Sequence, residues 1–296
     1  MTDALQIKGL TKHFKGFTLN SVSLTLPTGY IMGFVGQNGA GKTTTIRLIM
    51  NMAKRDAGQI TVLGYDNIAD ELTVKQEVAV VFDDLTMVDL WKIRDVEKAL
   101  SSFYTRWDSA TYHKYLHRFE LPLDRKIADL SRGMKLKLSM AVALSHDARL
   151  LILDEPTSGI DPVAREELLD ILHEYIESGD RSVFFSTHIT SDLAKVADYI
   201  TVIHNGNIFY SGTKDGLMEA FVLAKGHPQD LTEPLRASMF GLTVSKMDFT
   251  GLLPYAQRNL LTPRMVADWP TIDDILIYIA KDDREIYVAK EEYRHD

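Results

Sequence analysis

The feature that most constrains this chain is a glycine-rich segment between an apolar run and a helical pattern. Tyr30–Val35 is a short apolar run, typical of a buried strand, and Lys42–Met52 has the pattern of a helix. The loop between them, from Gly36 to Thr43, reads G-Q-N-G-A-G-K-T and matches the pattern G-x-x-x-x-G-K-[ST]. A strand, such a loop and a helix in this order predict a phosphate-binding loop on a parallel α/β sheet.

Each part of this loop has an expected role at phosphate groups. Glycines allow successive backbone N–H groups to point at a phosphate, and the helix N-terminus adds a favourable field. We expect Lys42 to reach the β- and γ-phosphate oxygens and Thr43 to hold magnesium. The residues predicted to bind the nucleotide here are Gly36, Gln37, Asn38, Gly39, Ala40, Gly41, Lys42, Thr43 and Thr44.

A second apolar run, Leu150–Leu153, ends in two carboxylates, Asp154 and Glu155. Parallel sheets place ligands at the carboxyl ends of their strands, so we expect Asp154 to contribute to a magnesium site. Glu155, one residue further, is predicted to polarise an attacking water. An acid after a strand is by itself commonplace and marks only a turn. The phosphate-binding loop in the same chain favours the functional interpretation.

Apolar runs and helical patterns alternate along the first part of the chain, which is typical of a mostly parallel sheet covered by helices. We expect further strands at Val78–Phe82, Arg149–Leu153 and Ser182–Phe185. The stretch from about residue 88 to 145 lacks strand signals, so it is predicted to be a helical insertion. Asn205-Gly206, between two apolar runs, predicts a two-residue hairpin.

The bulk composition excludes several classes of protein. The net charge of -8 argues against broad nucleic-acid binding, which requires an excess of Lys and Arg. The absence of cysteine excludes disulfides and thiol catalysis and suits a reducing cytoplasm. No apolar run approaches the ~20 residues that a membrane span requires, and the polar N-terminus shows no secretory signal. We therefore expect a soluble protein, whose role in transport would require a partner in the bilayer.

Taken together with four further segments, these motifs resemble the ABC ATPase family over roughly residues 1–220. Ser158 to Asp161 stand where the family has its D-loop. Ser186-Thr187-His188 resembles the H-loop, in which His188 would contact the γ-phosphate. Phe14 lies at the place of the aromatic residue that stacks on adenine. Leu130–Met134 resembles the signature motif, which reaches across a head-to-tail dimer to the partner's nucleotide.

The resemblance therefore implies a set of site residues that come from distant parts of the chain. It implies Lys42, Glu155 and His188 as catalytic residues. Beyond the phosphate-binding loop, the nucleotide-binding residues that it implies are Phe14, Ser131, Gly133, Ser158 and Asp161.

Four residues of this set also have a simpler structural interpretation. Asp161 precedes Pro162 and predicts a helix N-cap, and Ser131 is predicted to cap the following helix in the same way. His188 alone would be a solvated or core histidine, and Phe14 alone a core aromatic. Their common order and spacing along one chain favour the functional interpretation.

Two positions depart from the family pattern. In the signature, Arg132 replaces the first glycine and Met134 the glutamine, while Ser131 and Gly133 remain. The glutamine of the Q-loop corresponds to Asp83, which can still bind magnesium but is shorter and charged. The alternative is that Asp83 is only a surface carboxylate. The magnesium ligands predicted in all are Thr43, Asp83 and Asp154.

These departures resemble a bacterial branch that exports peptides, antibiotics or drugs, including members encoded beside GntR-type regulators. The fold that the resemblance implies is α/β, with a P-loop NTPase (RecA-like) core, an antiparallel β element and an inserted helical subdomain at about 85–148. An ABC ATPase domain would span 1–220, and a small α/β appendage would span 221–296. The appendage could add dimer contacts, act as a regulatory cap or be purely structural.

The resemblance implies an ATPase that uses ATP and Mg²⁺ and works as a homodimer or as a heterodimer with a related ATPase. It would lie at the cytoplasmic face of the membrane through a separate integral-membrane permease, and would bind no nucleic acid. The permease is expected to dock on about Leu85–Trp107, with Met87 and Trp91 as candidate exposed positions. The transported substrate and the direction of transport stay open.

Three rival functions share part of this pattern. A DNA-acting ABC protein would need long coiled coils, and a ribosome-acting factor would normally carry two ATPase cassettes. A P-loop kinase or GTPase would share the loop but would not explain Leu130–Met134, Ser158 to Asp161 and His188.

Overall fold

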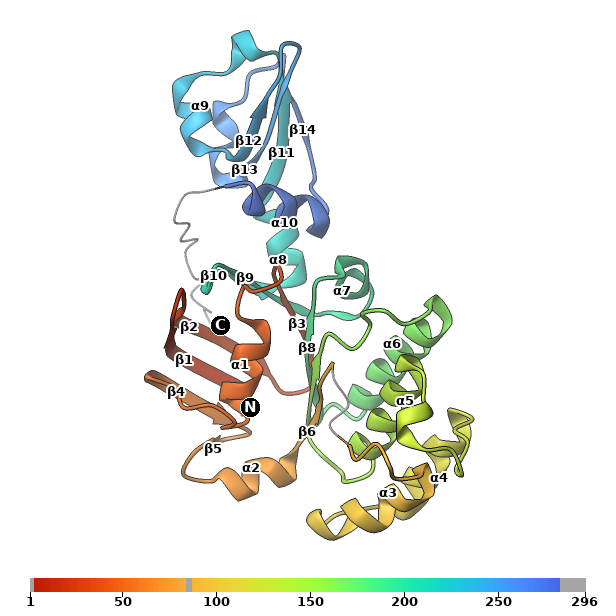
Figure 1. The fold of residues 1–296 in the computed structure, drawn as a ribbon. Helices are drawn as coiled ribbons and strands as arrows, with labels where there is room; N and C mark the ends of the chain where they lie inside the picture. Colours follow the sequence, from red (N-terminus) through yellow and green to blue (C-terminus); the bar gives the residue numbers. More distant parts are fainter. Residues whose placement is uncertain (1–2, 84–86, 283–296) are drawn as a thin grey trace.

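The computed structural model describes residues 3–83 and 87–282, which are organised by three β-sheets (Figure 1). Leu85 of the expected docking segment and residues 283–296 of the expected appendage lie outside the described residues. Within the described part of the chain, no helix is both long enough and apolar enough to cross a membrane.

The central sheet has six strands in the order β10-β9-β3-β8-β7-β6, and it confirms the predicted parallel α/β core. Its neighbouring strands are parallel, except that β9 and β10 form the predicted antiparallel hairpin around Asn205-Gly206. The strands are β3 (Ile31–Val35), β6 (Val78–Val81), β7 (Leu150–Asp154), β8 (Ser182–Thr187), β9 (Tyr199–His204) and β10 (Asn207–Thr213).

Side chains of the central strands alternate between two hydrophobic cores, as the pleat requires. Phe34 and Ile152 face the core that includes the N-terminal sheet and α1 (Lys42–Ile49). Leu151 and Phe185 face the opposite core, which is covered by α6 (Pro162–Ile176) and α7 (Thr190–Val196). Both faces are buried, which explains why these strands are almost continuously apolar.

Helix α1 is shorter than predicted. The pattern extended to Met52, whereas the helix ends at Ile49, with Met50 as its C-cap. Asn51 has a φ of +53°, a left-handed conformation that cannot continue an α-helix.

The N-terminal sheet is antiparallel, with strands in the order β2-β1-β4-β5, as predicted. It packs against α1 and, in Figure 1, lies on the opposite side of the central sheet from α6. Its strands are β1 (Asp3–Phe14), β2 (Phe17–Pro27), β4 (Ala57–Val62) and β5 (Tyr65–Asp66), and α2 (Glu71–Glu77) leads from it to β6.

The predicted helical insertion lies between β6 and β7, which are neighbours in the central sheet. Its helices are α3 (Ile93–Leu100), α4 (Ser109–Arg118) and α5 (Arg132–Ala143), with short 3₁₀ turns at Ser101–Phe103 and Ile127–Asp129. Tyr112 and Leu138 are buried among these helices.

The expectation that Met87 and Trp91 are exposed is wrong. Both side chains are half-buried and pack against the core of the helical insertion. The Trp91 backbone is held on both sides, since its N–H donates to Val88 and its carbonyl accepts from Ile127. The large apolar side chains that are exposed in this region are Val88, Leu90 and Phe103.

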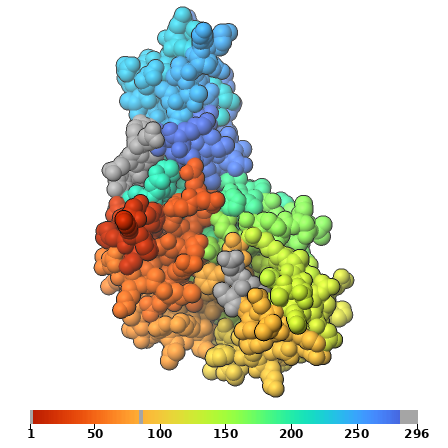
Figure 2. Space-filling view, in the orientation of Figure 1, coloured from red at the N-terminus to blue at the C-terminus, as the bar shows by residue number. Residues whose placement is uncertain are grey.

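A third, antiparallel sheet confirms the predicted C-terminal α/β appendage. Its strands run in the order β12-β13-β11-β14, and Figure 2 shows it within a narrower lobe above the wider body of the molecule. Val222, Phe249 and Leu253 belong to a small core of its own, together with Leu235 of α9. The elements are α8 (Lys214–Glu219), β11 (Phe221–Gly226), α9 (Glu233–Ser238), β12 (Phe240–Val244), β13 (Phe249–Pro254), β14 (Val266–Asp268) and α10 (Ile272–Ala280), with 3₁₀ turns at Pro228–Asp230 and Tyr255–Leu260.

Helix α10 lies between the third sheet and the central body (Figure 1). Its buried Ile272, Ile275 and Ile279 join the main core rather than the small one. Asp273 on the same helix accepts a hydrogen bond of 2.5 Å from the hydroxyl of Thr190, at the start of α7. The appendage therefore contacts the segment that directly follows His188.

Candidate functional site

The glycine-rich loop joins β3 to α1 with the backbone that a phosphate cradle needs. Gly39 and Gly41 have φ values of +81° and +114°, which favour glycine. A Cβ added to Gly36 would lie 2.2 Å from the Ile203 carbonyl oxygen, so the loop packs tightly on β9. A Cβ on Gly39 would meet no atom within 4 Å, so this part of the loop is open towards solvent.

Lys42 begins α1 beneath this loop and is only 6% exposed. Its ammonium donates to the carbonyl oxygens of Gly36 at 2.7 Å and Gln37 at 3.2 Å. It also forms an ion pair of 3.0 Å with Oε1 of Glu155, which directly follows β7, two strands away from β3 in the central sheet. A buried cation with these partners is held at the loop, where a phosphate would meet it.

Asp154 ends β7 as a buried carboxylate, and Ser186 of β8 fixes its orientation. The two residues are partners across the parallel strands, and the Ser186 hydroxyl donates to Oδ1 of Asp154 at 2.7 Å. The same hydroxyl accepts a hydrogen bond of 3.2 Å from the backbone N–H of Glu155. Sequence reasoning did not assign a role to Ser186, although it belongs to the segment that was singled out for His188.

Glu155 lies between Lys42 and His188 and contacts both side chains. Its φ of +51° is unusual for a residue with a side chain, and such strain is found where the surroundings fix a functional geometry. While Oε1 pairs with Lys42, Oε2 lies 2.7 Å from Nδ1 of His188 and accepts from the His188 backbone N–H at 3.2 Å. One carboxylate thus joins the phosphate-binding loop to His188, whose side chain is 44% exposed.

Phe14 ends β1 with its ring exposed, so it is not the core aromatic of the simpler interpretation. The side chain is 47% exposed, and its ring centroid lies 6.3 Å from that of Phe17. The Phe17 ring in turn would lie 3.1 Å from a Cβ on Gly41. Phe14 is therefore connected through Phe17 to the phosphate-binding loop, and the ammonium of Lys12 lies 5.7 Å from the centroid of its half-exposed ring.

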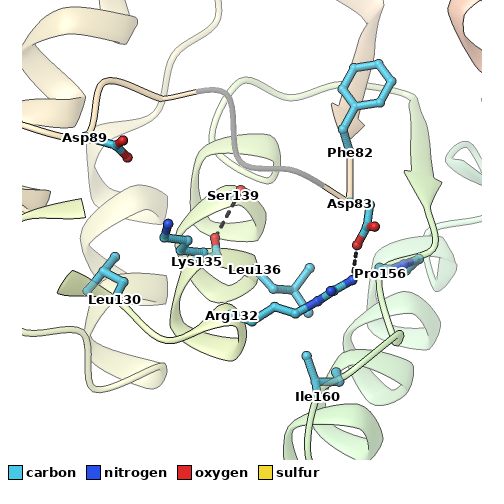
Figure 3. Close-up of a pocket in the computed structure, with 10 residues that line it drawn as sticks. All are labelled: Phe82, Asp83, Asp89, Leu130, Arg132, Lys135, Leu136, Ser139, Pro156 and Ile160. Carbon is cyan, nitrogen blue, oxygen red and sulfur yellow. Dashed lines mark hydrogen bonds and ion pairs between the residues drawn. The ribbon is translucent and has the colours of Figure 1, made fainter. Parts of the chain in front are cut away.

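Ser131, Arg132 and Gly133 begin helix α5, away from the phosphate-binding loop of the same chain. The Ser131 hydroxyl caps this helix by accepting from the Met134 backbone N–H at 3.3 Å. Arg132 forms an ion pair with Asp83, which follows β6 (Figure 3). In the single chain, the predicted site residues therefore form two clusters, one around Glu155 and one around Arg132.

Asp161 is the N-cap of α6, as the Asp-Pro sequence predicted. Its Oδ1 accepts from the backbone N–H groups of Val163 and Ala164 at 3.0 Å each. The Ala164 N–H, followed by that of Val163, lowers the pKa of this carboxyl group. Ser158 and Gly159 lie in the preceding loop, next to the cluster around Arg132.

Comparison with known proteins identifies the family. The family profile described as ABC transporter matches residues 19–158. Nod factor export ATP-binding protein I of Rhizobium sp. (strain N33) is 30% identical over 268 residues, which cover 82% of this chain and 83% of that protein. The chain belongs to the family of ABC transporter ATP-binding subunits. It is therefore an ATP-binding subunit of an ABC transporter and an ATPase.

Other relatives agree with this assignment. ABC transporter ATP-binding protein NatA of Bacillus subtilis (strain 168) is 30% identical over 212 residues, covering 68% of this chain and 84% of that protein. A solved structure described as the ATP-binding subunit of an ABC transporter is 27% identical, with a TM-score of 0.67 over 72% of this chain and 91% of that one. ABC ATPase subunits of this kind work with membrane permeases, and their fold is that of a P-loop NTPase.

Proposed function

We propose that this ABC subunit hydrolyses ATP with Glu155 orienting the attacking water, and that it drives a separately encoded permease from the cytoplasmic face of the membrane. The observation that carries the catalytic part is the position of the Glu155 carboxylate between Lys42 and His188, at 3.0 and 2.7 Å. Phosphate release from ATP by the purified chain, compared with its Glu155→Gln variant, tests this part.

The phosphate-binding loop and its neighbours fit a magnesium nucleotide. The open backbone at Gly39 and the buried ammonium of Lys42 suit a β- or γ-phosphate. Thr43 on α1 and the buried Asp154 supply the hydroxyl and carboxylate oxygens that magnesium prefers. When bound, Mg²⁺ would neutralise charge that develops on the phosphate oxygens.

Glu155 and the residues around it have different roles in the proposed hydrolysis. Glu155 accepts a hydrogen bond from a water molecule and turns it towards the γ-phosphate. Lys42 and His188 donate to the phosphate oxygens, where negative charge increases in the transition state. Ser186 keeps Asp154 oriented while also supporting the Glu155 backbone.

We further propose that two subunits complete each nucleotide site. Ser131 and Gly133 are placed at the surface end of α5, and a Cβ on Gly133 would meet no atom within 4 Å in its own chain. This open environment supports their use by a partner, which is a second copy of the chain or a related ATPase. Ser158 and Asp161 would line the same interface.

Export of a peptide, antibiotic or drug-like substrate is the transport role that we propose. The departures at Asp83 and Arg132 support the branch associated with such substrates and with GntR-type regulators. The Rhizobium relative is named for Nod factor export, which is a property of that protein.

The permease is proposed to dock where the helical insertion meets the central sheet. A cleft of about 450 Å³ at the end of β6 has a mixed lining, with apolar side chains such as Phe82, Leu130 and Leu136 and the charged side chains of Asp83, Asp89, Arg132 and Lys135. The adjoining Leu90 is 77% exposed. An exposed leucine beside a cleft that combines apolar and charged side chains supports a protein interface here.

Leu90→Glu should weaken binding of the permease at least about tenfold, because it places a charge in the core of the proposed interface. The measurement is a pull-down of a candidate permease, with circular dichroism to confirm folding. Leu72→Glu is the matched control, since Leu72 is 83% exposed but lies on α2. If Leu90→Glu and Leu72→Glu bind the permease equally well, Leu90 does not lie at the interface.

Phe14→Ala should raise the Kd for ATP about fivefold or more, because an aromatic ring that stacks on a base contributes about 1 kcal/mol or more. Fluorescence titration with ATP and with inorganic triphosphate measures the effect, and only ATP binding should weaken. Tyr65→Ala, a 38% exposed aromatic on the same sheet, is the control. An unchanged Kd for ATP in Phe14→Ala would show that Phe14 does not stack on adenine.

A further inference from the structure

Helix α7 begins two residues after His188 and lacks a side-chain cap. It spans seven residues, Thr190–Val196, and its N-cap is Ile189, whose side chain cannot accept a hydrogen bond. A helix this short is not stable by itself in water, so contacts with the rest of the fold fix where it begins. The position of His188 therefore depends on what holds the first turn of α7.

Two other helices hold this first turn through polar side chains. From α6, the guanidinium of Arg165 forms an ion pair with the buried Asp192 and donates to the Ser191 hydroxyl at 2.6 Å. From α10, the carboxylate of Asp273 accepts a hydrogen bond of 2.5 Å from the Thr190 hydroxyl. The three residues that begin α7 are thus each bound to a side chain of another helix.

The bond between Thr190 and Asp273 has open space beside it. Both residues line a cavity of about 450 Å³, together with His188 and with Gly36 of the phosphate-binding loop. Both also line a second cavity of about 320 Å³, whose other walls belong to α7, α8 and α10. Side chains that border a cavity lack close neighbours on one side. The hydrogen bond, more than close packing, therefore sets the distance between Asp273 and the start of α7.

The residues before Thr190 connect the same segment to Glu155. The His188 backbone N–H donates to Oε2 of Glu155 at 3.2 Å, and Nδ1 of His188 lies 2.7 Å from the same oxygen. The next backbone N–H, that of Ile189, donates to the Thr187 hydroxyl at 2.9 Å. A displacement of Thr190 would therefore move the backbone that carries His188 and change its contact with Glu155.

We propose that Asp273 is a positioning residue for ATP hydrolysis, acting from the C-terminal appendage through Thr190 on His188. The proposal rests on the roles proposed above for His188 and Glu155. Asp273 does not touch the nucleotide for this effect. It fixes the start of α7, and the placement of His188 beside Glu155 follows from that. The appendage thereby contributes to turnover, whereas ATP binding at the phosphate-binding loop does not depend on it.

Asp273→Ala and Thr190→Val each remove one partner of the bond. Each should lower kcat for ATP hydrolysis about tenfold, within the range that a small misplacement of a catalytic group causes. The Kd for ATP should stay at the wild-type value, because the phosphate-binding loop is unchanged. Thr190→Ser keeps the hydroxyl and should keep the wild-type kcat. Asp273→Ala combined with Thr190→Val should be no slower than either single variant, because both changes remove the same bond.

Asp268→Ala is the matched control in the appendage. Asp268 forms an ion pair of 2.9 Å with Lys225 on the third sheet, so its removal changes the charge of the appendage without touching Thr190. This variant should hydrolyse ATP as the wild type does. Circular dichroism checks the folding of every variant. Thr190→Val replaces a hydroxyl by a methyl group and keeps the test valid if Asp273→Ala does not fold.

A readout without hydrolysis shows whether Asp273 acts on His188. Nuclear magnetic resonance of the full chain with isotope-labelled histidine, without nucleotide, resolves the imidazole signals, and His188→Gln assigns that of His188. This signal should shift in Asp273→Ala and in Thr190→Val. The signal of His146, which is buried beside Val142 of α5, should not shift.

The proposal is overturned if Asp273→Ala and Thr190→Val leave either kcat or the His188 signal at the wild-type value. It is also overturned if Thr190→Ser is as slow as Thr190→Val. Wild-type hydrolysis by His188→Gln would contradict the proposed function itself. Slow hydrolysis by His188→Gln, beside an unshifted His188 signal in Asp273→Ala and Thr190→Val, would contradict only the positioning role of Asp273.

Discussion

Glu155→Gln should retain ATP binding and lose about 10²–10⁴-fold of the hydrolysis rate, the range expected when a group that handles a proton or orients water is removed. The amide keeps the shape of the side chain and its left-handed backbone position. The amide is neutral, whereas the carboxylate of Glu155 contacts Lys42 with one oxygen and His188 with the other. The variant therefore no longer polarises the attacking water. Phosphate release under saturating ATP and a parallel binding titration measure the two effects.

The control for this prediction is Glu177→Gln, an exposed glutamate at the C-terminal end of α6. It should hydrolyse ATP at the wild-type rate. Turnover by Glu155→Gln within a few fold of the wild type would show that another group orients the water.

Lys42→Ala should weaken ATP binding about 10–100-fold, which corresponds to the loss of a charge-assisted hydrogen bond of about 1.5–3 kcal/mol. The ammonium is buried between the loop carbonyls and Glu155, so truncation removes the cation that faces the phosphates and leaves the Glu155 carboxylate near them. Lys42→Ala should therefore raise the Kd for ATP, whereas Glu155→Gln should lower the hydrolysis rate and retain ATP binding.

Isothermal titration with ATP measures this difference. Arg47→Ala, on the exposed side of the same helix, is the matched control and should bind as the wild type does. Unchanged affinity in Lys42→Ala would contradict the placement of phosphate at the loop.

The core of the fold could be predicted because its signals are local. Apolar runs at β3, β7 and β8, a glycine-rich loop and an Asp-Pro helix start each depend on a few consecutive residues. The contact between Lys42 and Glu155 can also be inferred from the sequence, because β3 and β7 both end at the same edge of a parallel sheet.

What could not be predicted depends on contacts between distant segments. Nothing local indicates that Ser186 supports both Asp154 and Glu155, or that Thr190 donates to Asp273 on α10. The ion pair between Arg132 and Asp83 was missed although both residues had been noted as departures. Exposure was also misjudged, because Met87 and Trp91 are packed on the helical insertion while Leu90 is exposed.

Sedimentation velocity of the Glu155→Gln variant with Mg²⁺ and ATP tests most directly whether this chain works as an ABC-type ATPase, in which a partner's signature completes the site. We predict a monomer without nucleotide, a dimer with it, and a return to monomer when Gly133→Asp is added. An acidic residue suits the first turn of α5, and a Cβ at this position would meet no atom within 4 Å, but the carboxylate would repel the partner's phosphates. A dimer that survives Gly133→Asp, or no dimer in Glu155→Gln, would contradict the proposal.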